Sequence, residues 1–153
     1  MKKYFNKVFY RTASSIITTL TKGGSYPDWT FSGWTLLVGA QGSIKTGIEA
    51  DGEEGVDGGA TTYISGQKNP LEIEVKNFST ADYNTIMAAF LNKKVDVLLV
   101  DSDQISFGYA VFGTRLHPKL EVVSGEEPKI TLAGERKYGS EITTKPFQII
   151  TIS

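Results

Sequence analysis

The sequence predicts a mainly β protein, a β-sandwich or barrel, with one short α-helix packed against the sheet. Three observations lead to this prediction. Apolar and charged residues alternate over Leu71–Lys76 with the two-residue period of a strand that has one buried face. Residues 79–91 carry the cap and the apolar spacing of a single helix. Most of the 16 glycines lie in the first half of the chain, between short apolar segments.

The first half is expected to contain short strands and no helix. Apolar segments at Trp34–Val38 and Thr61–Ile64 are separated by glycines, which is typical of strands joined by turns. Between them, Ala50–Gly59 is acidic, rich in glycine and almost without apolar anchors. We therefore predict a long exposed loop near residues 50–60.

The helix is expected over Thr80–Leu91. Ser79 is placed to cap it, with Asp82 three residues later as an approximate capping box. Residues at helical spacing form one apolar stripe: Tyr83, Ile86, Met87, Phe90 and Leu91. Asn92 is a plausible stop, because asparagine tolerates the left-handed conformation that ends many helices.

Strands are predicted for the rest of the chain. Val95–Val100 is apolar throughout except for Asp96, which indicates a strand buried on both faces. Residues 105–111 alternate large and small side chains, so a neighbouring element is expected to approach the small face closely. A hairpin should join Leu120–Val123 to Lys129–Ala133, and Pro146–Ser153 should form a last strand.

Composition limits the classes of function. The length of 153 residues fits one domain, 1–153. With 16 basic and 17 acidic residues, the net charge of −1 provides no general attraction to nucleic acid or to anionic membranes. The absence of cysteine excludes disulfides and thiolate metal sites. Polar residues interrupt the apolar run after the basic start Met1–Lys3, so we expect no signal peptide and no membrane anchor.

Two segments partly resemble ligand-binding motifs. Gly39–Thr46 resembles a phosphate-binding loop, but Ile44 stands where that loop needs glycine, directly before Lys45. Four carboxylates in the expected loop, which are Asp51, Glu53, Glu54 and Asp57, are of the type that binds calcium. Their spacing does not follow the helix-loop-helix calcium pattern, and a solvated acidic loop explains them better.

No catalytic site is predicted. His117 is the only histidine and is expected in a turn beside Pro118, and no serine stands in a nucleophile elbow. We therefore expect no enzyme activity, no cofactor and no metal. Trp29 and Trp34, with Tyr26 and Phe31, are suited either to stacking on sugars or to the core or a protein interface. We favour core or interface, because short glycine-rich strands supply few other large apolar side chains.

The order of elements resembles that of the tail tube proteins of long-tailed bacteriophages, an architecture shared by the tubes of contractile injection systems. The resemblance covers roughly residues 71–152 and rests on the strand, the helix that begins Ser79-Thr80-Ala81-Asp82-Tyr83, the buried strand from Val95 and the closing antiparallel strands. It implies subunits that join their sheets into hexameric rings, which stack into a tube that conducts DNA. The protein would be made in the host cytoplasm and located in the virion tail.

The same resemblance implies roles for individual residues. The loop with Asp51, Glu53, Glu54 and Asp57 would reach a neighbouring ring, and Glu72 and Glu74 would line a lumen past which DNA slides without specific binding. The partners would be further copies of this chain and other tail proteins. Two alternatives stay open: another tail component on the same fold, such as a terminator, neck or hub protein, and a monomeric glycan- or protein-binding β module.

Overall fold

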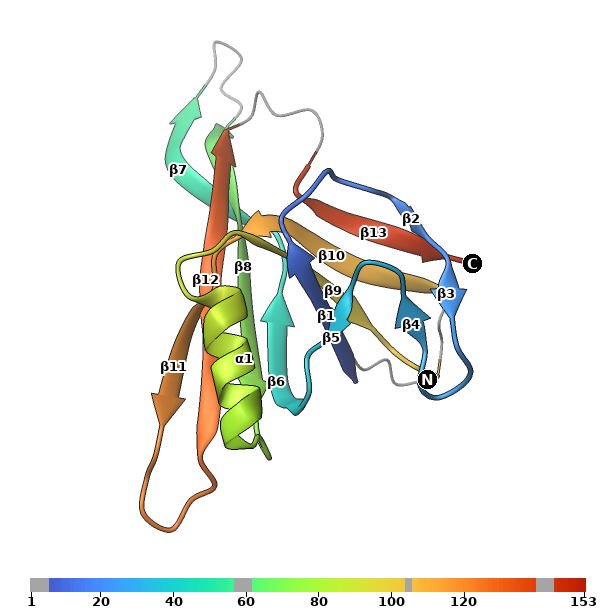
Figure 1. The fold of residues 1–153 in the computed structure, drawn as a ribbon. Coiled ribbons are helices and arrows are strands. Elements are labelled where there is room, and N and C mark those ends of the chain that lie inside the picture. Colours follow the sequence, from blue (N-terminus) through green and yellow to red (C-terminus); the bar gives the residue numbers. More distant parts are fainter. Residues whose placement is uncertain (1–5, 57–61, 104–105, 140–144) are drawn as a thin grey trace.

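The computed structural model describes residues 6–56, 62–103, 106–139 and 145–153, and it confirms a mainly β fold with one helix (Figure 1). The strands of the first half are β1 (Lys7–Thr12), β2 (Thr19–Leu20), β3 (Lys22–Gly23), β4 (Thr30–Phe31), β5 (Thr35–Leu36), β6 (Ala40–Thr46) and β7 (Glu49–Val56). They are followed by β8 (Thr62–Val75), α1 (Thr80–Phe90), β9 (Val95–Val100), β10 (Phe107–Thr114), β11 (His117–Glu121), β12 (Lys129–Gly139) and β13 (Phe147–Ile152).

A six-stranded sheet, in the order β2-β13-β10-β9-β1-β5, forms one layer of the molecule. Every residue of β9 at its centre is buried, as the apolar sequence of this strand predicts. Gly108 on β10 lies against β9, because a Cβ atom at this position would come within 2.8 Å of Val100 Cγ1 and 2.9 Å of the Leu99 carbonyl oxygen. The close approach expected for the small face of this strand is therefore confirmed.

A five-stranded sheet forms the second layer, in the order β11-β12-β8-β6, with β7 paired to β8 beyond β6. The sequence predicts two separate strands where β8 is one strand of 14 residues. Pro70 is tolerated inside it because it lies level with the interruption between β6 and β7. There the Asn69 side chain donates from Nδ2 to the Gly47 carbonyl at 3.1 Å, and the Thr46 hydroxyl donates to the Pro70 carbonyl at 3.0 Å.

The helix has the predicted cap. The Ser79 side chain accepts from the Asp82 amide at 3.1 Å, and the Asp82 carboxylate accepts from the Ser79 amide at 3.0 Å. Ile86 and Phe90 are buried, whereas Leu91 is exposed. Asn92 has a φ of 57°, the left-handed conformation that ends the helix at the expected position.

Two hydrophobic cores hold these layers together. The first lies between the two sheets and helix α1, and its buried residues include Val97, Leu99, Ile73, Leu132 and Phe90. The second lies on the opposite face of the six-stranded sheet, where the segment after β1 covers it with Phe31, Trp34, Ile16 and Ile17. The six-stranded sheet is thus buried on both faces.

Three expectations about local structure need correction. Residues 50–56, expected in an exposed loop, form most of β7 and pair with β8, and Asp57 lies outside the described residues. The strand expected over Trp34–Val38 is only two residues long, and His117 begins β11 instead of occupying a turn. In each case backbone pairing with another strand decides the structure, and local composition does not report such pairing.

Candidate assembly surfaces

The five-stranded sheet has one dry face and one wet face. Along β8, Leu71, Ile73 and Val75 are buried in the first core, whereas Glu72 and Glu74 are half-buried on the opposite face. Glu72 and Glu74, the two residues expected to line a lumen, therefore lie on the same face of the sheet.

The wet face carries charges of both signs. The strand registers place five basic and seven acidic residues on it: Lys45, Lys68, Lys119, Lys129, Lys137, Glu49, Asp51, Glu54, Glu72, Glu74, Glu121 and Glu135. Six ion pairs, with N–O distances of 3.0–3.9 Å, connect members of this set. Glu74, one of the two glutamates that stand out in the sequence, pairs with a lysine from the neighbouring strand β12.

The ion pairs of the wet face form a charged ladder across the strands, and Lys129 takes part in two of them. Its ammonium group lies 3.7 Å from a carboxylate oxygen of Glu74 and 3.7 Å from one of Glu121. Lys119 lies 3.0 Å from Glu121. The hydrogen bond from Lys119 and its positive charge lower the pKa of Glu121, and Lys129 adds to this effect. The two lysines thus favour the charged form of Glu121.

The five-stranded sheet has open edges in the described part of the chain. β6 and β7 both pair with the same side of β8, and no described strand pairs with their other side. On the opposite side of the sheet, β11 covers only residues 129–133 of β12, so residues 134–139 lack a strand neighbour there. Figure 1 shows β7 and the adjoining ends of β8 and β12 extending beyond the six-stranded sheet. Glu49, Asp51, Glu53 and Glu54 all lie on β7.

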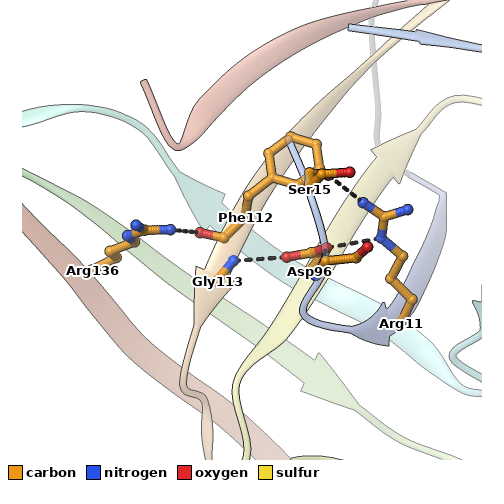
Figure 2. A network of polar contacts seen from close by, with 7 residues as sticks. Arg11, Ser15, Asp96, Phe112, Gly113 and Arg136 are labelled. Carbon is orange, nitrogen blue, oxygen red and sulfur yellow. Dashed lines mark hydrogen bonds and ion pairs between the residues drawn. The ribbon is translucent and has the colours of Figure 1, made fainter. Parts of the chain in front are cut away.

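A buried carboxylate is the centre of a polar network in the six-stranded sheet. Asp96 on β9 is fully buried and accepts hydrogen bonds from Arg11 Nε at 2.8 Å, the Ser14 amide at 3.0 Å and the Gly113 amide at 2.7 Å (Figure 2). Arg11 also donates to the Ser15 carbonyl at 2.8 Å. Both oxygens of the carboxylate have partners, so its burial is compensated by direct contacts.

A bulge and a second arginine extend this network. The pairing of β10 with β9 shifts register between Val111 and Thr114, and Gly113 has a φ of 67° within that bulge. From β12, Arg136 Nη1 donates to the Phe112 carbonyl at 2.6 Å (Figure 2). The sequence signal for the network was one aspartate in an apolar strand. Its arginine partner is 85 residues away and could not be recognised.

The aromatic residues divide between core and surface. Trp34 and Phe31 are buried in the second core, and Trp29 is half-buried with its indole donating to the Ser102 carbonyl at 3.2 Å. Tyr26 is exposed, and its hydroxyl donates to Asp103 at 2.8 Å. A sugar-binding platform needs several aromatic faces open to solvent. Because Trp34 and Phe31 are buried, two of the four aromatic residues considered for stacking on sugars are not open to solvent.

The remaining candidate ligand sites lack the geometry of their class. Lys45 lies on strand β6 instead of in a loop before a helix. His117 is exposed at the start of β11. The described residues contain no group of three or more histidine or acidic side chains arranged to hold a metal ion, and none of their helices is long and apolar enough to cross a membrane.

No protein-family model matches the chain, and no curated protein is significantly similar to it in sequence.

Proposed function

We propose that this protein is a structural subunit of a phage tail that assembles into stacked hexameric rings and so builds the tube that conducts DNA. The observation that carries the proposal is the five-stranded sheet, which has a dry face, a wet face and, among the described strands, an open edge on each side. Unpaired strand edges are templates for pairing with another chain. When the two edges of one subunit differ, each subunit joins the next head to tail, and a suitable rotation closes a ring.

The wet face supports a lumen that does not grip DNA. Its acidic residues outnumber its lysines, and four of its five lysines form ion pairs with glutamates. Release of counterions from DNA requires cations that are free to neutralise phosphates, and paired lysines supply little of this attraction. In the proposed tube, Glu72 and Glu74 belong to this lining, and DNA is in transit without specific binding.

The projecting end of the five-stranded sheet supports contact between rings. β7 and the end of β8 extend beyond the other sheet (Figure 1), so their tip reaches outside the body of the subunit. Stacked rings need such an axial contact. The proposed partners are thus copies in the same ring, copies in the next ring, and other virion tail proteins at the tube ends.

The proposal is tested by the size of the purified protein. Size-exclusion chromatography with light scattering, over a wide range of protein concentrations, should show large species, and negative-stain microscopy should show rings or tubes. A single monomeric mass at every concentration, with no rings or tubes in the micrographs, would contradict the proposed function. That result would favour a monomeric binding module, which glycan arrays would then examine.

A further inference from the structure

A basic pocket lies at the open edge of β12. It has a volume of about 390 Å³, and its lining residues are Lys94, Gly113, Arg115, Glu135, Arg136 and Lys137. Four of these carry a positive charge and one carries a negative charge. The single carboxylate, Glu135, already lies 3.8 Å from Lys68 and 3.8 Å from Lys137. Within the described residues, Lys94 and Arg115 form no ion pair, so the pocket keeps a positive excess.

One wall of the pocket is fixed by the buried network. Arg136 is half-buried and is oriented by its hydrogen bond to the Phe112 carbonyl. Its guanidinium group occupies the space where a side chain at Gly113 would stand. The Gly113 amide is in turn held by Asp96. The arginine is therefore positioned before any ligand arrives, which reduces the entropy lost on binding.

The chain itself carries a matching acidic segment. Residues 46–67 contain no lysine or arginine but five carboxylates, at Glu49, Asp51, Glu53, Glu54 and Asp57. The first four lie on β7, at an open edge of the sheet. Within one subunit, β8 lies between β7 and β12, and Lys68 on β8 lies 3.9 Å from Glu49 on β7 and 3.8 Å from Glu135 in the pocket. The open edges of β7 and β12 are on opposite sides of this sheet, so these two edges can meet only between two copies.

We propose that the basic pocket receives the carboxylates of β7 from a second copy of this chain, with that β7 lying beside residues 134–139 of β12. The inference rests on the proposed function and names the two surfaces that meet in it. The contact is head to tail, because the acidic edge and the basic edge are on opposite sides of one sheet. Opposite charges at the two edges also select the correct pairing, since two acidic or two basic edges repel each other.

The test uses two charge-reversed variants. The pocket-reversed variant is Lys94→Glu/Arg115→Glu, and the strand-reversed variant is Glu53→Lys/Glu54→Lys. Each variant alone presents like charges across the contact and should need at least about tenfold more protein to assemble than the wild type. An equimolar mixture should recover assembly, because each variant then meets its complement. The control Lys22→Glu/Lys93→Glu makes the same charge change at two lysines outside the pocket and outside the wet face of the five-stranded sheet, and it should assemble like the wild type.

The outcomes separate the inference from the proposed function. Light scattering on all four proteins and on the mixture gives the readout, and thermal unfolding checks that each variant is folded. Assembly of the wild type with no effect of either reversal would overturn the inference and leave the proposed function standing. Wild-type protein that stays monomeric overturns both. Binding of a short labelled DNA duplex that the pocket-reversed variant loses, with assembly unchanged, would assign the pocket to phosphate and also overturn the inference.

Discussion

The two sheets of this protein have different surroundings. The six-stranded sheet is covered on both faces, and its buried carboxylate, Asp96, is paired with the half-buried Arg11 and with backbone groups. The five-stranded sheet is covered on one face, carries a charged ladder on the other and has open edges in the described part of the chain. The difference indicates a division of labour in which the first sheet stabilises the subunit and the second presents its contact surfaces.

The largest expected effect comes from the buried charge. Asp96→Ala leaves Arg11 without its carboxylate and the Gly113 amide without its acceptor, and should lower the free energy of unfolding by about 3–5 kcal/mol. Glu74→Ala breaks a half-exposed ion pair on the other sheet and should cost no more than about 1 kcal/mol. Urea unfolding of both variants measures the comparison. Equal losses would contradict the division between the sheets.

Glycine substitutions sharpen the same comparison at smaller scale. Gly108→Ala in the six-stranded sheet places a methyl group against Val100 and the Leu99 carbonyl, and should cost about 1–3 kcal/mol through overpacking.

Gly47, between β6 and β7, has open space around the position of a Cβ atom. Gly47→Ala should change the free energy of unfolding by less than about 1 kcal/mol, in the stabilising direction, because alanine restricts the unfolded chain. Denaturation midpoints of the two variants give the result. A Gly47→Ala protein as unstable as Gly108→Ala would show that both sheets are packed equally tightly.

These contrasts also explain which features the sequence could predict. The helix and β9 were predictable because a cap, an apolar stripe and an unbroken apolar run are local signals. β7 was not, because its glycines and carboxylates form a strand only through backbone pairing with β8. Asp96 was visible as an exception in β9, but neither Arg11 nor the bulge at Gly113 carries a signal that connects it to that aspartate. The ion pairing of the wet face was hidden because four of its five lysines come from strands other than β8, which holds Glu72 and Glu74.

The smallest expected effect concerns the charged ladder. Lys119→Ala removes the hydrogen bond that lowers the pKa of Glu121, so this pKa should rise toward its ordinary value. Because the folded pKa lies below the unfolded one, the contribution of Glu121 to stability is present above the unfolded pKa. It is lost as the pH falls through the folded pKa. Titration of the side-chain carboxyl carbon by NMR measures the change. An unchanged titration midpoint would mean that Lys119 does not act on Glu121 in solution.

Hydrogen exchange of the free and the assembled protein tests the division between the two sheets most directly. Amides of β9 and β10 should be protected in both states, because they belong to the doubly covered sheet. Amides of β7 and of residues 134–139 should gain protection only on assembly, when the edges of two copies meet. Protection that appears instead at β2 or β5, with no change along β7 and β12, would contradict the assignment of assembly to the five-stranded sheet.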